Sequence, residues 1–379
     1  MQLRAFHSRG NFKQARNKKD ILQRTHCQGF SLLELLVVMG ILSILIMLLL
    51  PAVMHSRSSA RRLACMNQLR QLSLAMTMQI DQTNRFPAAG LFGKTGNRKY
   101  HNWVTTLLPH LDQAGLFNSY DLSKEYLDGQ NFELTRTPLP VLVCPDDVSA
   151  QRGEGNLSYV VNGGIGWTIP IDCPATLHAE EASLSIRPLD LNGNGVVCPL
   201  EPEPGPGRTD LDFLKALSLF FVENWPDRSG TQRFHRRQDV TDGLTTTLML
   251  SENIRAGFDP RAASSWGTPE PFRAMFFVSA RVCPKDRCGS GTIDLAEANN
   301  RQDSASAREA LNSSVEQAEG TAPWPSSGHP GLVHVGWGDG HVSPLSENVD
   351  AGVYFAIVTP QGGQVQDRFA EPLVNGMSF

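Results

Sequence analysis

The chain has 379 residues, enough for one large domain or two moderate ones, and its 24 prolines and 33 glycines favour a loop-rich body over a helical bundle. Its net charge of −4 is unevenly distributed: residues 1–29 carry seven basic side chains and one acidic one, so this segment has a net charge of +6 and the remainder −10. An acidic body lacks the clustered positive surface that phosphate binding requires, so nucleic acid is not an expected partner.

The first predicted element is a membrane-spanning helix over residues 30–50. The run FSLLELLVVMGILSILIMLLL is 21 residues long, about the length that a helix needs to cross the hydrocarbon layer, and its only charge is Glu34. The basic tract before it should stay in the cytoplasm. We therefore expect a single-pass membrane protein in contact with lipid, with a cytoplasmic N-terminus and a head in the periplasm or on the cell surface.

Two simpler explanations of this run are a secretory signal peptide and a plain anchor. A signal peptide has a shorter apolar core followed by a cleavage site between small residues, and the sequence PAVM that follows at 51–54 is a poor match. A plain anchor leaves Glu34 unexplained, because an ionisable group inside a membrane span is costly and usually functional.

The sequence around this carboxylate, Gly29-Phe30-Ser31-Leu32-Leu33-Glu34, resembles the type IV prepilin cleavage and methylation motif. The resemblance implies that prepilin peptidase is a partner, which cleaves after Gly29 and methylates the new amino terminus at Phe30. Residues 1–29 would then be a cytoplasmic leader, Glu34 the fifth mature residue, and Pro51 the position where pilin helices commonly kink.

Simple physical chemistry agrees with these roles. A carboxylate in lipid is relieved if Glu34 pairs with the Phe30 ammonium of a neighbouring subunit, so other pilin-like subunits are expected partners through this helix. Pro51 removes one backbone hydrogen bond and should bend the helix where it leaves the bilayer.

The helix is predicted to continue outside the membrane as an amphipathic half over residues 51–84. Apolar side chains recur every three or four residues and define one face, and the pattern ends before Asn84 and Pro87, so we expect the helix to end at about Thr83. The predicted face consists of Leu63, Met66, Leu69, Leu72, Met76 and Ile80.

Residues 85–379 are predicted to form an exported α+β head, pilin-like in that the long N-terminal helix packs on an antiparallel β-sheet. A loop-rich insertion is expected at about 172–230, with a helix over Asp210–Glu223, and a polar spacer at about 296–320 that is either an exposed helix or disordered. The expected strands are Val141–Val143, Ser158–Val161, Thr245–Leu250, Ala274–Val278, Leu332–Trp337 and His341–Leu345.

A second resemblance covers nearly the whole chain. It rests on several short pieces in a fixed order: RR at 61–62, CMNQL at 65–69, RFP at 85–87, WVTTLLPHLDQAGL at 103–116, VCPDD at 143–147, SYVVN at 158–162, TDGLTTT at 241–247, SE at 251–252, and His329-Pro-Gly followed after nine residues by Asp339-Gly340. These pieces resemble the exported prepilin-like proteins of domain-of-unknown-function family 1559, which end in a His-x9-Asp-Gly motif and have no assigned reaction. The resemblance also implies a disulfide between Cys65 and Cys144.

One segment of the predicted insertion resembles a calcium loop. The spacing D-x-[DN]-x-[DN]-G-x5-E is found from Asp190 to Glu201, with Gly195 permitting the sharp turn. The rival interpretation is an Asn-Gly turn cluster without an ion. The expected ligands are Asp190, Asn192, Asn194, the Val196 carbonyl and Glu201.

Seven cysteines become six once the leader with Cys27 is removed, and an even number in an oxidising compartment suggests disulfides. Six cysteines allow fifteen connectivities. Local bridges are possible within two pairs, Cys173 with Cys198 and Cys283 with Cys288. A zinc site is less expected, because no C-x2-C pair is present.

Four polar side chains lie close in sequence near the C-terminus: His329, His334, Asp339 and His341. They suggest a metal or hydrolytic site. The sequence Gly338-Asp339-Gly340, however, is typical of a hairpin turn. A histidine beside such a strand and turn more often orders the backbone than carries catalysis, so we favour a structural role and no enzymatic activity.

The sequence therefore predicts a pilin or pseudopilin-like subunit with a structural role in a pilus or a type II secretion-like assembly, joined through residues 30–80. The alternative is a membrane-tethered adhesin or receptor that does not polymerise and is stabilised by calcium. A third hypothesis, an exported metal-dependent enzyme, rests on the C-terminal histidines alone.

Overall fold

The computed structural model describes residues 31–93, 98–165, 210–223, 234–257, 259, 264–279, 281–282, 293–294, 298–299, 301 and 309–368. The chain divides into two compact units, residues 1–56 and residues 57–379. One helix, α1 (Leu32–Thr83), contributes to both. Within the first unit its side chains are exposed from Leu32 onwards, and α1 is the one helix in the described part of the chain that is long and apolar enough to cross a membrane.

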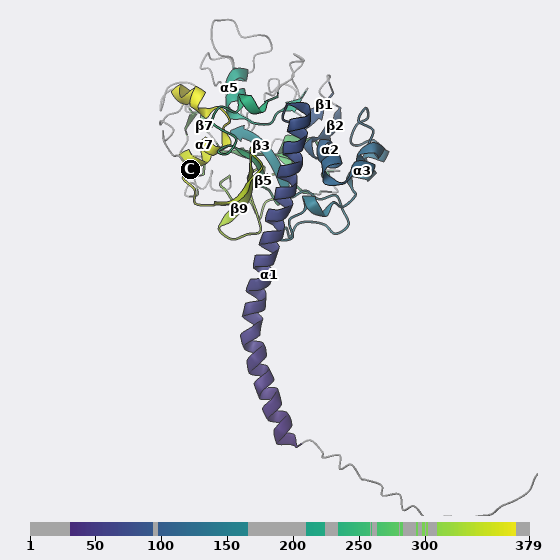
Figure 1. The fold of residues 1–379 in the computed structure, drawn as a ribbon, viewed down its shortest axis with the longest axis vertical. Coiled ribbons are helices and arrows are strands. Elements are labelled where there is room, and N and C mark those ends of the chain that lie inside the picture. Colours follow the sequence, from purple (N-terminus) through teal and green to yellow (C-terminus); the bar gives the residue numbers. More distant parts are fainter. Residues whose placement is uncertain are drawn as a thin grey trace, which may run out of the picture. The chain divides into compact units, whose positions relative to one another are not determined.

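The second unit is a head built on a five-stranded sheet in the order β10-β9-β5-β3-β6 (Figure 1). The predicted α+β, pilin-like fold is confirmed. All neighbouring strands of this sheet are antiparallel except β3 and β6, which are parallel. Its strands are β3 (Tyr159–Ile165), β5 (Leu248–Glu252), β6 (Met275–Val278), β9 (Leu332–Trp337) and β10 (Val342–Ser346).

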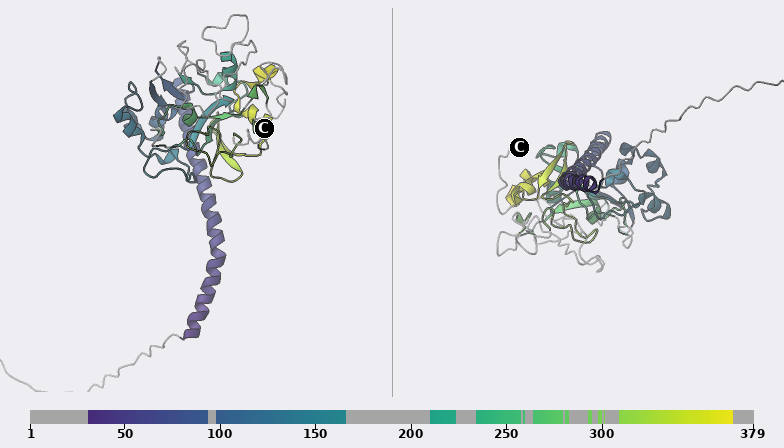
Figure 2. Two further views of the ribbon diagram at one scale, coloured as in Figure 1. Left: turned by 180° about the vertical axis from the view of Figure 1, so that it is seen from behind. Right: turned by 90° about the horizontal axis from the view of Figure 1, so that it is seen from below.

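The C-terminal part of α1 lies across this sheet, with α2 (Trp103–Leu107) and α3 (Ala114–Ser119) to one side and α7 (Ala351–Val358) to the other (Figures 1 and 2). The Tyr159 hydroxyl of β3 donates a hydrogen bond to the Cys65 carbonyl of α1. The helix ends at Thr83 as predicted, because Asn84 adopts the left-handed conformation that terminates helices.

The buried face of α1 is shifted slightly from the predicted one. Leu69, Leu72, Met76 and Ile80 are buried as expected, whereas Leu63 is exposed and Met66 only half-buried. The buried face also includes three smaller side chains, Cys65, Ser73 and Ala75. Small residues allow the helix to approach the sheet closely, and a Cβ added at Gly336 of β9 would lie 2.4 Å from the Ser73 hydroxyl oxygen.

A second, three-stranded sheet has the order β2-β1-β4, with bounds β1 (Gly90–Phe92), β2 (Lys99–Asn102) and β4 (Val222–Glu223). A two-stranded sheet joins β7 (Arg281–Val282) and β8 (Ile293–Asp294). The remaining helices and helical turns in the described ranges are η1 (Leu108–Leu111), α4 (Gly129–Thr135), η2 (Pro140–Leu142), α5 (Asp210–Leu217), η4 (Arg237–Asp239), α6 (Pro271–Ala274) and η6 (Gly362–Arg368).

Three local predictions are wrong. The strand expected at Val141–Val143 is replaced by η2, which begins at Pro140. The helix expected over Asp210–Glu223 ends at Leu217 and is followed by strand β4, whose pairing with β1 makes this end of the predicted insertion part of the head core. Residues 309–320 of the predicted spacer form packed turns, with Ala310, Leu311 and Ser314 buried, rather than an exposed helix or a disordered segment.

Candidate functional site

The N-terminal half of α1 presents an apolar surface with one carboxylate. In the first unit, all residues from Leu32 to Leu50 are exposed. One Glu34 carboxylate oxygen accepts a hydrogen bond from the Ser31 backbone N–H at 2.9 Å. This places the Glu34 carboxylate at the positive, N-terminal end of the helix dipole, next to Ser31. Gly29 and Phe30 themselves lie outside the described residues.

Pro51 lies inside α1, and the helix continues through it. Proline has no N–H, so the Met47 carbonyl one turn earlier lacks its usual helical partner.

A buried disulfide ties α1 to the rest of the head. It joins Cys65 of α1 to Cys144, which follows η2, across a sequence separation of 79 residues. Both cysteines are buried. The disulfide implied by the family resemblance is thereby confirmed, and closing a loop of this length stabilises the fold by about 4.5 kcal/mol on the chain-entropy estimate.

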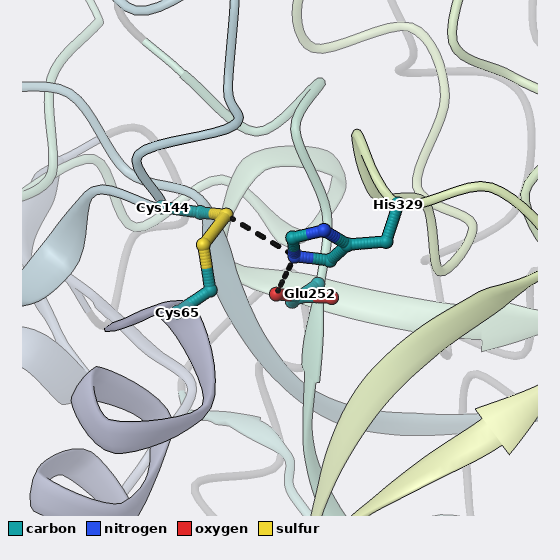
Figure 3. Close-up of side chains that lie close together, drawn as sticks. All are labelled: Cys65, Cys144, Glu252 and His329. Carbon is teal, nitrogen blue, oxygen red and sulfur yellow. Dashed lines mark hydrogen bonds and ion pairs between the residues drawn. A yellow bond between two sulfur atoms is a disulfide. The ribbon is translucent and has the colours of Figure 1, made fainter. Parts of the chain in front are cut away.

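His329 lies directly against this disulfide (Figure 3). Its Nε2 is 3.7 Å from the Cys144 sulfur and 3.4 Å from Oε1 of Glu252. Its other ring nitrogen, Nδ1, is 3.0 Å from Oδ2 of Asp146, and Asp146 also pairs with Arg61 of α1. The imidazole therefore lies between two carboxylates and a sulfur atom.

Glu252 is the fully buried centre of this cluster. It ends β5, and the antiparallel register of β5 with β9 pairs Ser251 with Val335, which brings Glu252 next to His334. The His334 backbone N–H donates to Oε2 of Glu252 at 2.8 Å, and its ring Nδ1 lies 3.1 Å from Oε1. Burial alone would raise the pKa of Glu252, but the hydrogen bonds and charges of the two histidines outweigh it and lower the pKa.

The loop before β9 fixes the position of His329. The Ser327 hydroxyl accepts a hydrogen bond from the His329 N–H at 3.1 Å, and the Asn312 side-chain amide donates to the His329 carbonyl at 3.1 Å. Gly328 allows this loop to approach the neighbouring segment, because a Cβ there would lie 2.3 Å from the Asp146 carbonyl oxygen. Replacing this glycine would push His329 away from Asp146.

The structure separates the residues of the C-terminal motif. His329 precedes β9, whereas Asp339 and Gly340 form the turn after it, where Gly340 has a positive φ and its N–H donates to the Trp337 carbonyl. Asp339 instead contacts His341, whose Nδ1 is 2.6 Å from the carboxylate. His329 and Asp339 therefore form no common site.

Several predicted residues lie outside the described part of the chain. They are the calcium loop Asp190, Asn192, Asn194, Val196 and Glu201, and the cysteines Cys173, Cys198, Cys283 and Cys288. These predictions stand on the sequence alone.

Sequence reasoning gave no role to Glu252 or Asp146, although both lie in segments that carry the family resemblance. The available signal was an ionisable residue, Glu252, closely following the apolar run LML at 248–250. A carboxylate in that place must be paired when it is buried.

Comparison with known protein families agrees with this anatomy. The family described as "Protein of unknown function (DUF1559)" matches residues 54–352, and the prokaryotic N-terminal methylation motif matches residues 24–50. The chain belongs to this family. No curated protein and no solved structure matched it. The methylation motif makes the chain a type IV pilin-like protein that prepilin peptidase processes, and the apolar N-terminal part of α1 is its membrane anchor or signal-like segment.

Proposed function

We propose that the processed chain is a structural subunit of a pilus or a type II secretion-like assembly, joined to its neighbours through the helix at residues 30–80. The observation that carries this proposal is the exposed apolar surface of α1 from Leu32 to Leu50, on which Glu34 is the single charge. A helix that is apolar on all sides is stable only in lipid or among other helices.

The role of Glu34 follows from the cost of a charge in lipid. An unpaired carboxylate there is expensive, and a cation nearby relieves the cost. Processing after Gly29 would create an ammonium group at Phe30, four residues before Glu34. The Phe30 ammonium of an adjacent subunit can then pair with Glu34, which fixes the register between neighbouring helices.

The experiment is crosslinking in native cells, comparing the unaltered chain with Glu34→Ala. We expect a ladder of multimers from the unaltered chain and its loss in the variant, with Glu34→Asp retaining part of it. Ser43→Ala is the matched control, since Ser43 is also polar and exposed on this helix but its hydroxyl is satisfied by the Met39 carbonyl. All variants must be found in the membrane fraction.

The rival is a tethered binding module that never polymerises. It predicts monomers in both the unaltered chain and the variant. Multimers that persist in Glu34→Ala would also count against the pairing that we propose.

We further propose that the loop 190–201 binds calcium and thereby stabilises the head. Calorimetry on the whole chain in detergent tests this, since Asp190→Ala should abolish the heat of calcium binding. Absence of heat from the unaltered chain would refute the proposal. We propose no enzymatic activity for the chain.

A further inference from the structure

The cluster around His329 contains a complete set of metal-ligating atoms. Cys65, Cys144, Glu252 and His329 each offer one ligand atom, and these atoms all lie within 4.8 Å of one another. All four side chains are buried. They come from four separate places: α1, the segment after η2, the end of β5 and the loop before β9 (Figure 3).

A disulfide alone does not explain these surroundings. A cystine bridge needs no polar partner, whereas a fully buried carboxylate costs several kcal/mol unless it is paired. Glu252 and His329 nevertheless both lie at the bridge, with the His329 Nε2 3.7 Å from the Cys144 sulfur.

The contacts behind these side chains are those that orient metal ligands. A histidine that binds metal usually donates its other N–H to a carboxylate, and His329 Nδ1 lies 3.0 Å from Asp146, which Arg61 holds in turn. Ligating carboxylates are themselves hydrogen-bonded, and Oε2 of Glu252 accepts the His334 backbone N–H.

We propose that, when the Cys65–Cys144 bridge is reduced, these four side chains bind one zinc ion through the two thiolates, Nε2 of His329 and the carboxylate of Glu252. Zinc bonds of about 2.0–2.3 Å in a tetrahedron separate neighbouring ligand atoms by about 3.3–3.8 Å. The distances from His329 Nε2 to Glu252 and to Cys144, 3.4 and 3.7 Å, already match. The two sulfur atoms must move apart once the bridge is broken, and the four ligand atoms, now within 4.8 Å of one another, must close to tetrahedral spacing.

Thiolates and imidazole together select zinc over magnesium or calcium. Four protein ligands in a closed, buried site make it structural, with no open position for a substrate. The disulfide and the zinc ion therefore exclude each other, and each would join α1 to the head.

The chemistry balances with a trialkylphosphine as reductant. The phosphine takes the oxygen atom of one water molecule and becomes the phosphine oxide, while the S–S bond breaks and the two sulfur atoms each gain a hydrogen from that water. Zinc then displaces the two thiol protons to solvent.

The test uses the full chain in detergent with the other five cysteines replaced by serine: Cys27, Cys173, Cys198, Cys283 and Cys288. After phosphine reduction and removal of free metal, we expect one zinc ion per chain, and none in the oxidised protein. Cobalt in place of zinc should give thiolate-to-metal charge-transfer absorption in the reduced protein only.

Substitutions distinguish this site from non-specific binding to thiols. His329→Ala and Glu252→Gln each remove a ligand and should weaken zinc binding at least tenfold. Asp146→Asn removes no ligand but alters the orientation of His329, and should weaken binding by about 10–100-fold. Asp339→Asn is the matched control, since that carboxylate lies in the β9–β10 turn, and it should leave the affinity unchanged.

Two results would overturn the proposal. The first is a reduced chain that binds no zinc. The second is binding that survives both His329→Ala and Glu252→Gln, since an unfolded chain that holds zinc through its two cysteines would be insensitive to them.

Discussion

His101 in β2 has a buried ring nitrogen, Nδ1, without a hydrogen-bond partner among the described residues. Burial lowers the pKa of His101 to about 4, whereas the unfolded chain titrates near 6.5. The unfolded state therefore binds a proton in this window that the folded state does not. Stability that is present above pH 6.5 is lost as the pH falls from 6.5 to 4, by up to about 3 kcal/mol.

We predict that His101→Gln reduces this fall in stability between pH 7 and pH 4.5, because glutamine does not titrate. Urea denaturation at the two pH values measures it. An equally large fall in the variant would show that other groups control the acid sensitivity of the head.

Gly328 is a second position at which a single added carbon atom should change the stability of the head. An added methyl group would lie 2.3 Å from the Asp146 backbone carbonyl oxygen, and backbone cannot move away cheaply. We predict that Gly328→Ala destabilises the head by about 1–3 kcal/mol. Gly115→Ala is the control, because Gly115 lies in α3 with open space around it, and there alanine should be neutral or slightly stabilising.

Thermal or urea unfolding measures both glycine variants. Equal stability of Gly328→Ala and the unaltered chain would show that the loop before β9 tolerates displacement, and that His329 is less firmly positioned than the contacts indicate.

At this scale the sequence identified some members of the buried cluster and missed others. All five of Cys65, Cys144, Asp146, Glu252 and His329 belong to short pieces that carry the family resemblance, but only the cysteines and His329 suggested a chemical role. The meeting of Glu252 with His334 depends on the register of β5 with β9, two segments about 80 residues apart. Local patterns contain no information about that register, so these contacts could not be predicted.

At the scale of single elements, α1 was the most predictable. Its length, its end at Thr83 and most of its buried face follow from periodicity and from the turn residues after it. The prediction of a strand at Val141–Val143 was wrong because so short an apolar run has no periodicity that distinguishes a strand from a helical turn. Pro140 there begins a turn that buries Leu142 instead.

The buried face of α1 gives a direct test of this packing. Leu72 is completely buried in the core, whereas Leu74, two residues later, is 60% exposed. We predict that Leu72→Ala costs about 2–5 kcal/mol of unfolding free energy and that Leu74→Ala costs well below 1 kcal/mol. Denaturant unfolding of both variants in detergent checks this, and similar losses from the two substitutions would contradict the packing described.

At the scale of the whole molecule, the chain combines an apolar helix before residue 57 with a folded head after it. The two parts were predictable to different degrees. The apolar helix could be predicted because a short local motif, the cleavage and methylation motif with the apolar run after it, is visible directly in the sequence. The strand order of the head arises from contacts between distant segments, including the parallel pairing of β3 with β6, and was predicted only as a class.

Processing at the N-terminus is the step on which this account of the whole molecule depends. If prepilin peptidase cleaves after Gly29, trypsin should release a first peptide spanning residues 30–57, because no lysine or arginine lies between these ends. Mass spectrometry of the protein from native membranes should find this peptide beginning at Phe30, with one hydrogen of its amino terminus replaced by a methyl group. A chain that still carries residues 1–29, or one cut beyond the apolar run, would contradict the account.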